Sequence, residues 1–109
     1  MVREQVIDAL VRARELVERG WCQGWFARDA DGVEVSFASQ SACRFCAIGA
    51  IRRVADIPDG NNGIGLLFRA GGLTALDLAA WNDAPERTQA DVLALYDAAI
   101  ALARAEATP

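Results

Sequence analysis

The residues with the greatest capacity for chemistry are three cysteines, Cys22, Cys43 and Cys46. Cys43 and Cys46 form a C-x-x-C pair, a spacing shared by thioredoxin-like redox pairs and by halves of structural zinc sites. A structural zinc site needs four ligands, whereas this chain offers three thiols and at best a carboxylate. Cysteine is also among the residue types most often fully buried, so we favour small core hydrophobes over redox or metal chemistry.

Catalysis by these thiols would lack a base. The chain has no histidine and no lysine, which excludes imidazole chemistry, Schiff bases and the phosphate-loop lysine. Cys22 is followed by Gln23, which superficially resembles a thiol-protease nucleophile with its oxyanion-hole glutamine. However, it follows the expected C-terminus of a helix, where the dipole disfavours a thiolate. We therefore reject a Cys22 nucleophile, expect no catalytic residue, metal or cofactor, and lean against an enzyme without deciding the question.

A second group of interest is Trp81-Asn82-Asp83, followed by Arg87. An aromatic face beside an amide, a carboxylate and a guanidinium suits a ligand or a partner peptide. In the alternative interpretation, Trp81 belongs to the core, Asn82 caps a helix C-terminus and Asp83 pairs with Arg87. The alternative is favoured for the cluster taken alone, because Asn and Asp at helix ends usually bond to the backbone.

The first element that positions these residues is a helix over residues 2–19. Asp8/Arg12 and Glu15/Arg19 stand at ion-pair spacing on its polar face. Gly20 occupies the position of a left-handed C-terminal cap. The apolar residues recur at three- and four-residue steps, which places on one face Val2, Val6, Ala9, Leu10, Ala13, Leu16 and Val17.

Between residues 25 and 37 the pattern changes from helix to strand. Two short extended pieces flank the turn sequence DADG, and Val33, Val35 and Phe37 alternate with polar residues. An isolated hairpin is only marginally stable, so this one must pack against the helices or relax into an ordered loop.

A second helix is expected to begin at Ser39 or Ser41 and to end near Ala55. Its sequence is apolar almost all round, which is typical of a central, buried helix. This range places both cysteines of the C-x-x-C pair on nearly one side of the helix. Gly49 costs on the order of 1 kcal/mol against alanine, which is understandable if another backbone or a bulky ring presses close there.

The following segment contains the clearest breaks. Residues 56–63 (DIPDGNNG) are expected to form a loop, and residues 64–70 a short helix stopped by two glycines. Thr74 could cap another short helix that runs through Ala80, after which Asn82, Asp83 and Pro85 break the chain.

The last helix has two possible starts. Thr88 with Asp91 forms one capping pattern, which we prefer over Asp83 with Glu86. Residues 106–109 are expected to fray. The buried stripe of this helix consists of Val92, Leu95, Tyr96, Ala99, Leu102 and Ala103.

The composition favours one domain over residues 1–109. This length can close a single core, and 53% hydrophobic with 24% charged residues is typical of a globular chain. The N-terminus lacks a secretory hydrophobic region, and no apolar run approaches the ~20 residues of a membrane span. A net charge of −4 does not match the basic surface of a nucleic-acid binder. We therefore expect a cytoplasmic protein with neither nucleic acid nor a membrane as partner.

Three motifs together resemble a family of small bacterial and phage proteins known only as a domain of unknown function. They are Gly20-Trp21-Cys22-Gln23-Gly24, Phe45-Cys46-Ala47 with Gly49-Ala50, and Trp81-Asn82-Asp83 with Arg87-Thr88 and Val92-Leu93. The resemblance extends over nearly the whole chain. It implies a compact single domain, often carried by phages or mobile elements, with no activity to transfer. Cys43 lies outside the family pattern, whose positions include Trp21, Cys22, Gln23, Cys46, Trp81, Asn82, Asp83 and Arg87.

Taken together, these observations predict a mainly α-helical fold, a compact bundle of four to five helices with a small hairpin or ordered loop at about 25–37. The favoured function is a non-enzymatic cytoplasmic binding module for a protein or small ligand. Its site is expected where the 20–24 corner meets the 81–87 corner, because both carry tryptophan beside polar groups at helix ends. The candidate binding residues are Trp21, Cys22, Gln23, Trp81, Asn82, Asp83 and Arg87.

Two alternatives stay open. In one, the protein is thiol- or metal-dependent and uses Cys22 with Cys46. In the other, the family motifs only specify the fold, so that replacing Gln23 and Arg87 by alanine lowers stability without affecting any binding.

Overall fold

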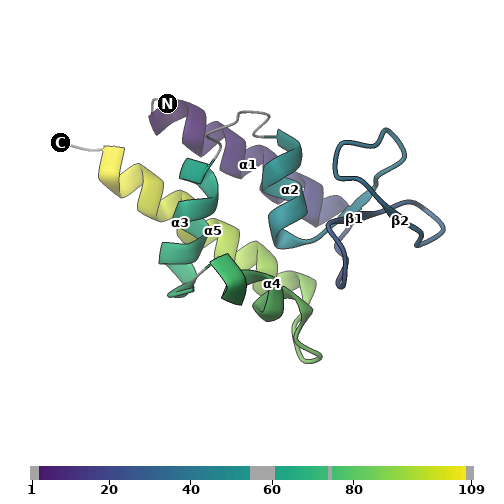
Figure 1. Cartoon of the computed structure of the whole chain (residues 1–109). Coiled ribbons are helices and arrows are strands. Elements are labelled where there is room, and N and C mark those ends of the chain that lie inside the picture. Colours follow the sequence, from purple (N-terminus) through teal and green to yellow (C-terminus); the bar gives the residue numbers. More distant parts are fainter. Residues whose placement is uncertain (1–2, 55–60, 74, 108–109) are drawn as a thin grey trace.

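The computed structural model describes residues 3–54, 61–73 and 75–107, which form five helices and a small three-stranded sheet (Figure 1). The predicted class, a mainly α-helical bundle with a small hairpin, is confirmed. None of the helices in these ranges has the length and apolar character needed to cross a membrane. The elements in chain order are α1 (Arg3–Arg19), β1 (Ala27–Arg28), β2 (Glu34–Val35), β3 (Arg44–Phe45), α2 (Ala47–Val54), α3 (Asn61–Gly71), α4 (Ala75–Asp83) and α5 (Gln89–Ala107).

Helices α1 and α5 form the framework, lying side by side and running in opposite directions (Figure 1). The apolar faces predicted for α1 and α5 are confirmed at the positions that the structure describes. Val2, which was predicted to belong to the α1 face, lies outside the described residues. An ion pair between Arg14 and Asp97 (2.6 Å) joins the outer surfaces of the two helices. The residues of both faces that are fully or nearly fully buried are Val6, Ala9, Leu10, Ala13, Val17, Val92, Leu95, Tyr96, Ala99 and Ala103.

The N-terminus of α5 is capped as predicted. The Asp91 amide donates to Thr88 Oγ1 (3.2 Å), and the Thr88 amide donates to Asp91 Oδ2 (3.0 Å). The other end differs from expectation, because α5 is still helical at Glu106, where an ion pair with Arg69 of α3 holds the last turn. Of the segment expected to fray, residues 108–109 lie outside the described part of the chain.

The predicted hairpin is confirmed and carries a third strand. β1 pairs antiparallel with β2, Ala27 facing Val35, and on its other side with β3, Ala27 facing Phe45. In the turn, Asp29 Oδ1 accepts the amides of residues 31 and 33, both at 2.9 Å, and Gly32 adopts a φ of 83°. The turn therefore needs no bound ion to hold its shape.

The expectation that the second helix begins at Ser39 or Ser41 is wrong. That stretch forms turns and β3, and α2 begins only at Ala47. Its backbone bonds to the preceding segment, since the Cys43 amide donates to Arg28 O (2.9 Å) and the Cys46 amide donates to Phe26 O (3.1 Å). Pairing with β1 thus overrides the local helical pattern. The two cysteines do not share a helix face: Cys43 is exposed and Cys46 is buried.

Two glycines, Gly49 and Gly20, permit close contacts with the backbone of other segments. A Cβ at Gly49 would overlap the Phe26 carbonyl, which confirms the expected close approach of another backbone. Gly20 does not have a positive φ, so the predicted left-handed cap is wrong. A Cβ on Gly20 would instead overlap the Cys43 carbonyl, because the chain continues extended into the bridge between Trp21 and Phe45.

In the C-terminal half, two helices are longer than predicted. Helix α3 begins at Asn61, inside the expected loop over 56–63, of which 56–60 lie outside the described residues. It ends at the predicted glycines, with Gly72 at a φ of 64°. Helix α4 continues past Ala80, so it ends in the polar cluster that was expected to break the chain, and Thr74 is outside the described residues.

Candidate functional site

The 20–24 corner and the C-terminus of α4 are joined by a network of hydrogen bonds, which we call the clasp. It links residues 21–24, at the end of α1, to residues 82–84, at the end of α4. The expected meeting of these two corners is therefore present, although about 60 residues separate them.

Asn82 is the centre of the clasp and is only 1% exposed. Its Oδ1 accepts the Trp21 indole N–H (2.9 Å) and the Ala47 amide (3.0 Å). Its Nδ2 donates to the Cys22 carbonyl (3.2 Å) and to Asp83 Oδ1 (2.9 Å). Both lone pairs and both hydrogens of the amide are used, so Asn82 has no hydrogen-bonding capacity left for a ligand.

Gln23 completes the connection by capping α4. Its Nε2 donates to the carbonyls of Asn82 (3.0 Å) and Ala84 (2.9 Å), groups that a helix end otherwise leaves without a partner. The Gly24 amide donates to Asp83 Oδ1 (2.9 Å), with Gly24 at a φ of 83°. The C-terminal cap of α4 therefore comes from Gln23, and the expectation that Asn82 caps this helix is wrong.

Arg87 lies against Trp81 rather than Asp83. Its Nε donates to the Trp81 carbonyl (2.7 Å), and its guanidinium carbon is 4.2 Å from the centre of the indole ring. Its ion pair is with Asp91 (3.8 Å). The expected Asp83–Arg87 pair is therefore replaced by a stacked arginine that fixes the turn between α4 and α5.

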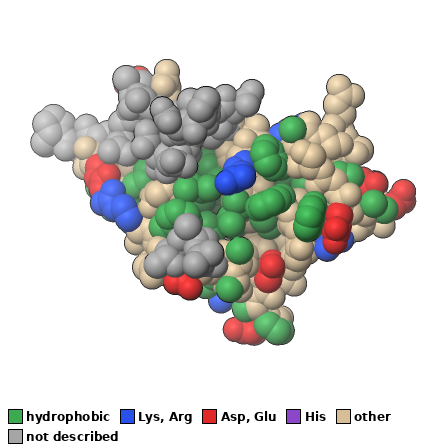
Figure 2. Space-filling model, viewed as in Figure 1, with side chains coloured by type: hydrophobic (Ala, Val, Ile, Leu, Met, Phe, Trp, Pro, Cys, Tyr) green, Lys and Arg blue, Asp and Glu red, His purple; other side chains and the backbone are tan. Residues whose placement is uncertain are grey.

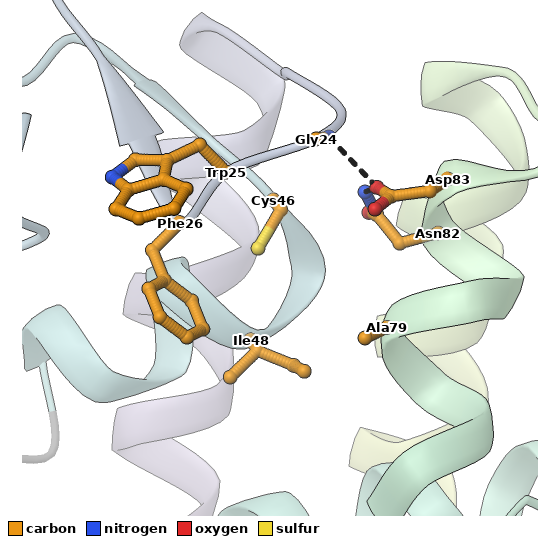
Figure 3. A pocket seen from close by; sticks show the side chains of 8 residues that line it. All are labelled: Gly24, Trp25, Phe26, Cys46, Ile48, Ala79, Asn82 and Asp83. Carbon is orange, nitrogen blue, oxygen red and sulfur yellow. Dashed lines mark hydrogen bonds between the residues drawn. The ribbon is translucent and has the colours of Figure 1, made fainter. Parts of the chain in front are cut away.

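Beside the clasp is an open cleft of about 180 Å³ with a predominantly apolar lining (Figure 3). Trp25 and Phe26 lie on one side, the C-terminal half of α4 lies on the other, and the start of α2 lies between them. Figure 2 shows hydrophobic side chains gathered on this face of the molecule, over the region between α2 and α4. The residues that line the cleft are Gly24, Trp25, Phe26, Cys46, Ile48, Ala79, Asn82 and Asp83.

The aromatic side of the cleft is unusually open to solvent for such large side chains. Trp25 is 47% exposed and Phe26 37% exposed, and their ring centres are 6.1 Å apart. Phe26 also meets the edge of Phe37 at 6.2 Å and has the Arg52 guanidinium at 5.7 Å from its ring centre. These neighbours hold the Phe26 ring in position without covering it.

Two of the seven predicted binding residues, Asn82 and Asp83, line the cleft. The main polar groups of Trp21, Gln23 and Arg87 are engaged in contacts within the protein. The binding role of the seven residues stays a prediction.

Sequence reasoning missed the aromatic side of the cleft, although a signal was present. The signal is the pair of adjacent large aromatic residues, Trp25 and Phe26, in a segment of bends just before β1. Two successive large rings next to a small sheet are difficult to bury together, and both stay partly exposed beside the same cleft. Ile48 and Ala79 gave no comparable signal, because their exposure depends on how α2 and α4 pack.

The two buried cysteines have an environment that disfavours thiolates. Burial raises the pKa of Cys22 to about 11, and the thiol donates to the Trp25 carbonyl (3.6 Å). Burial also raises the pKa of Cys46, whose sulfur accepts the Gly49 amide (3.2 Å) and so caps the N-terminus of α2. Both groups are therefore protonated at neutral pH, when a thiol is a weak nucleophile and a poor metal ligand.

The described ranges contain no group of three or more His, Cys, Asp and Glu side chains that could hold a metal ion. Tyr96, the largest fully buried side chain, donates its hydroxyl to the Ala47 carbonyl, and burial raises its pKa well above the ordinary value. The buried polar side chains Asn82 and Tyr96 thus serve the fold, whereas the cleft leaves large apolar side chains open to solvent.

Comparison with curated proteins and with solved structures found no match. The model of a family of unknown function, DUF6197, matches residues 1–102. This range includes α1, the sheet, the whole clasp and every residue that lines the cleft. The chain therefore belongs to DUF6197, a family of unknown function, as its resemblance to a domain of unknown function predicts.

Proposed function

We propose that this protein is a non-enzymatic binding module that acts in the cytoplasm and binds its partner through the cleft between Trp25–Phe26 and α4. The observation that carries the proposal is the exposure of two large aromatic rings beside an open apolar cleft. Exposed aromatic side chains next to a concave apolar surface are typical of binding sites. The phage or mobile-element origin that the resemblance implies stays a prediction.

The rigidity of the cleft supports the same conclusion. The clasp fixes Gly24, the residue before Trp25, to Asp83 on α4, and Phe26 O accepts the Cys46 amide. Both sides of the cleft are thereby anchored by hydrogen bonds outside its apolar lining. A preformed cleft loses less conformational entropy on binding, which favours recognition.

The test uses N-acetyl-norleucine amide, a neutral apolar probe, with binding followed by amide and indole N–H signals in NMR spectra. The probe is expected to shift the indole signal of Trp25 and the amide signals of Phe26 and Ile48. The indole signal of Trp21 is expected to stay in place, because that group donates to Asn82 inside the clasp. No shift up to the solubility limit of the probe, or shifts confined to another face, would overturn the proposal.

Helix α4 offers a matched pair of control variants. Ala79 and Ala80 are both exposed, but Ala79 lines the cleft and Ala80 does not. Ala79→Leu is expected to fill the cleft and abolish the shifts, whereas Ala80→Leu leaves them unchanged. Because leucine and alanine are both good helix formers, neither variant should unfold α4.

The thiol- or metal-dependent alternative would use Cys22 and Cys46, which are near enough for the charge of Cys46 to influence that of Cys22, but burial keeps both thiols protonated. A titration of native protein with a thiol reagent at neutral pH distinguishes it from the binding module. The binding module predicts one reactive thiol, the exposed Cys43, and two that react only after unfolding. Rapid reaction of Cys22 or Cys46, or a metal bound by the purified protein, would favour the alternative.

A further inference from the structure

We propose that the cleft receives a basic side chain, arginine in the first place, that a partner protein presents. This inference rests on the proposed binding function and adds the chemistry of the partner. The occupant would lay its aliphatic stem along the apolar lining and bring its cation to Asp83 at the rim.

The size of the cleft favours a single side chain. Sites for drug-sized ligands and cofactors occupy roughly 300–1,000 Å³, and this cleft measures about 180 Å³. Its lining is predominantly apolar, with Phe26 on one side, Ala79 on the other and Ile48 between them (Figure 3). Such a slot fits the unbranched stem of a long side chain, a group that readily packs on apolar surface while its charged end stays in water.

The negative charge of Asp83 at the rim of the cleft favours a cationic ligand. Asp83 is the one ionisable side chain other than a thiol among the residues that line the cleft, and it is exposed. Its Oδ1 accepts the Gly24 amide and Asn82 Nδ2. No hydrogen bond to Oδ2 occurs within the described ranges, so this oxygen is available to a ligand. A carboxylate held in place by two internal donors is a preorganised acceptor for a guanidinium.

The aromatic side of the cleft adds a second attraction for cations. The faces of aromatic rings carry negative electrostatic potential and attract arginine more often than lysine. Within this chain, Arg87 stacks on Trp81 at 4.2 Å, and Arg52 and Arg53 lie over Phe26 and Phe45 at 5.7 and 5.9 Å. Trp25, which is more exposed than any of these rings, has no cation over its face in the part of the chain that the structure describes.

The net charge of the chain also favours a basic partner. At −4 it attracts a basic partner and repels an acidic one over distances of a Debye length. Complementary charge mainly improves the rate and the selectivity of encounter, and the apolar cleft supplies the contact area.

The experiment compares three capped amino acids by NMR titration of the full chain. N-acetyl-arginine amide is the cationic probe, N-acetyl-citrulline amide has nearly the same shape without the charge, and N-acetyl-norleucine amide is purely apolar. We expect the arginine probe to bind about fivefold more tightly than citrulline, the effect of one partly exposed charge pair. All three are expected to shift the indole signal of Trp25.

Two variants with the same change of charge show where the preference arises. Asp83→Asn retains an Oδ1 that accepts the Gly24 amide, so the clasp is preserved while the charge is lost. It is expected to remove the preference for arginine over citrulline and norleucine. Glu86→Gln removes a charge from an exposed residue that does not line the cleft, and it should keep the arginine preference.

The outcomes separate this inference from the function on which it rests. If norleucine and citrulline bind as tightly as arginine, the cleft is a purely apolar site, and the inference fails while the proposed function stands. If Asp83→Asn keeps the preference, or Glu86→Gln loses it equally, the cation is not recognised at the rim and the inference is overturned. If no probe shifts Trp25, both proposals fail.

Discussion

The clasp and the cleft lie side by side and share Gly24, Asn82 and Asp83, but they differ in how their side chains are used. In the clasp, amide and indole groups that look suited to binding are turned inward and bond to one another. In the cleft, apolar side chains that look suited to the core are left open to solvent. Asp83 belongs to both regions, because one oxygen serves the clasp while its carboxylate lies at the rim of the cleft.

This difference shows that a polar cluster can lie beside a proposed binding site without supplying most of its surface. A buried polar group without a partner costs about 1–3 kcal/mol, so a cluster of such groups near a core is under strong pressure to pair internally. Once paired, the clasp holds the aromatic side of the cleft against α4. The polar residues thereby position a binding surface that consists mainly of other residues.

The strongest test of the clasp is Asn82→Ala. The substitution removes the partners of the Trp21 indole, the Ala47 amide and the Cys22 carbonyl, so we expect the free energy of unfolding to fall by about 4 kcal/mol. Urea denaturation with an unchanged m-value measures this loss. A loss below about 1 kcal/mol would mean that Asn82 is not the centre of the clasp.

Two tryptophans allow the clasp and the cleft to be compared directly. Trp21→Ala is expected to lower the free energy of unfolding by about 3 kcal/mol, because it removes a half-buried ring and its bond to Asn82. Trp25→Ala is expected to cost only about 1 kcal/mol, because the ring is half exposed, and to abolish probe binding. If urea denaturation shows that both variants lose the same free energy of unfolding, the clasp and the cleft do not differ as described.

The contact that seats Phe26 on α2 is tested by a pair of helical glycines. Gly49→Ala is expected to lower the free energy of unfolding by about 2 kcal/mol, because its Cβ would overlap the Phe26 carbonyl. Gly65→Ala in α3 has nothing within 4 Å of its Cβ and is expected to raise the same quantity by up to about 1 kcal/mol. Thermal or urea unfolding of both variants should therefore show shifts of opposite sign.

The last prediction concerns pH, and it is a gradual loss of stability in alkaline solution. The folded Cys22 has a pKa of about 11 against 9.0 for the unfolded group, so between these values the folded state binds more protons than the unfolded state. Stability from this thiol is therefore fully present below pH 9 and falls by at most about 1.4 kcal/mol per pH unit above it.

The matched variant for that prediction is Cys22→Ala, in which the decline of unfolding free energy with pH should be shallower. The rest of the decline is expected from Cys46 and Tyr96, since burial raises the pKa of both. An identical pH dependence in the variant and the parent protein would show that Cys22 is not buried as the structure has it.

The sequence was most informative where the neighbours in the chain are also the neighbours in space. The face of α1, the stripe and cap of α5 and the turn between β1 and β2 were all predicted from periodicity and capping residues. The helix expected from Ser39 was wrong because its alternative partner, β1, comes from a different part of the chain. The meeting of the two corners was predicted, whereas the sequence left open whether their polar groups bind a partner or only serve the fold.

By itself, then, the sequence determined the helical class, the apolar faces of α1 and α5, the exclusion of histidine and lysine chemistry and a resemblance to a family of unknown function, which the match to DUF6197 identifies. These properties follow from residue types and local spacing. The tertiary structure decided which polar groups would pair, since Asn82 reaches partners that are about 60 residues away. It also decided that Trp25 and Phe26 would border a cleft, because exposure depends on what the packing of α2 and α4 leaves uncovered.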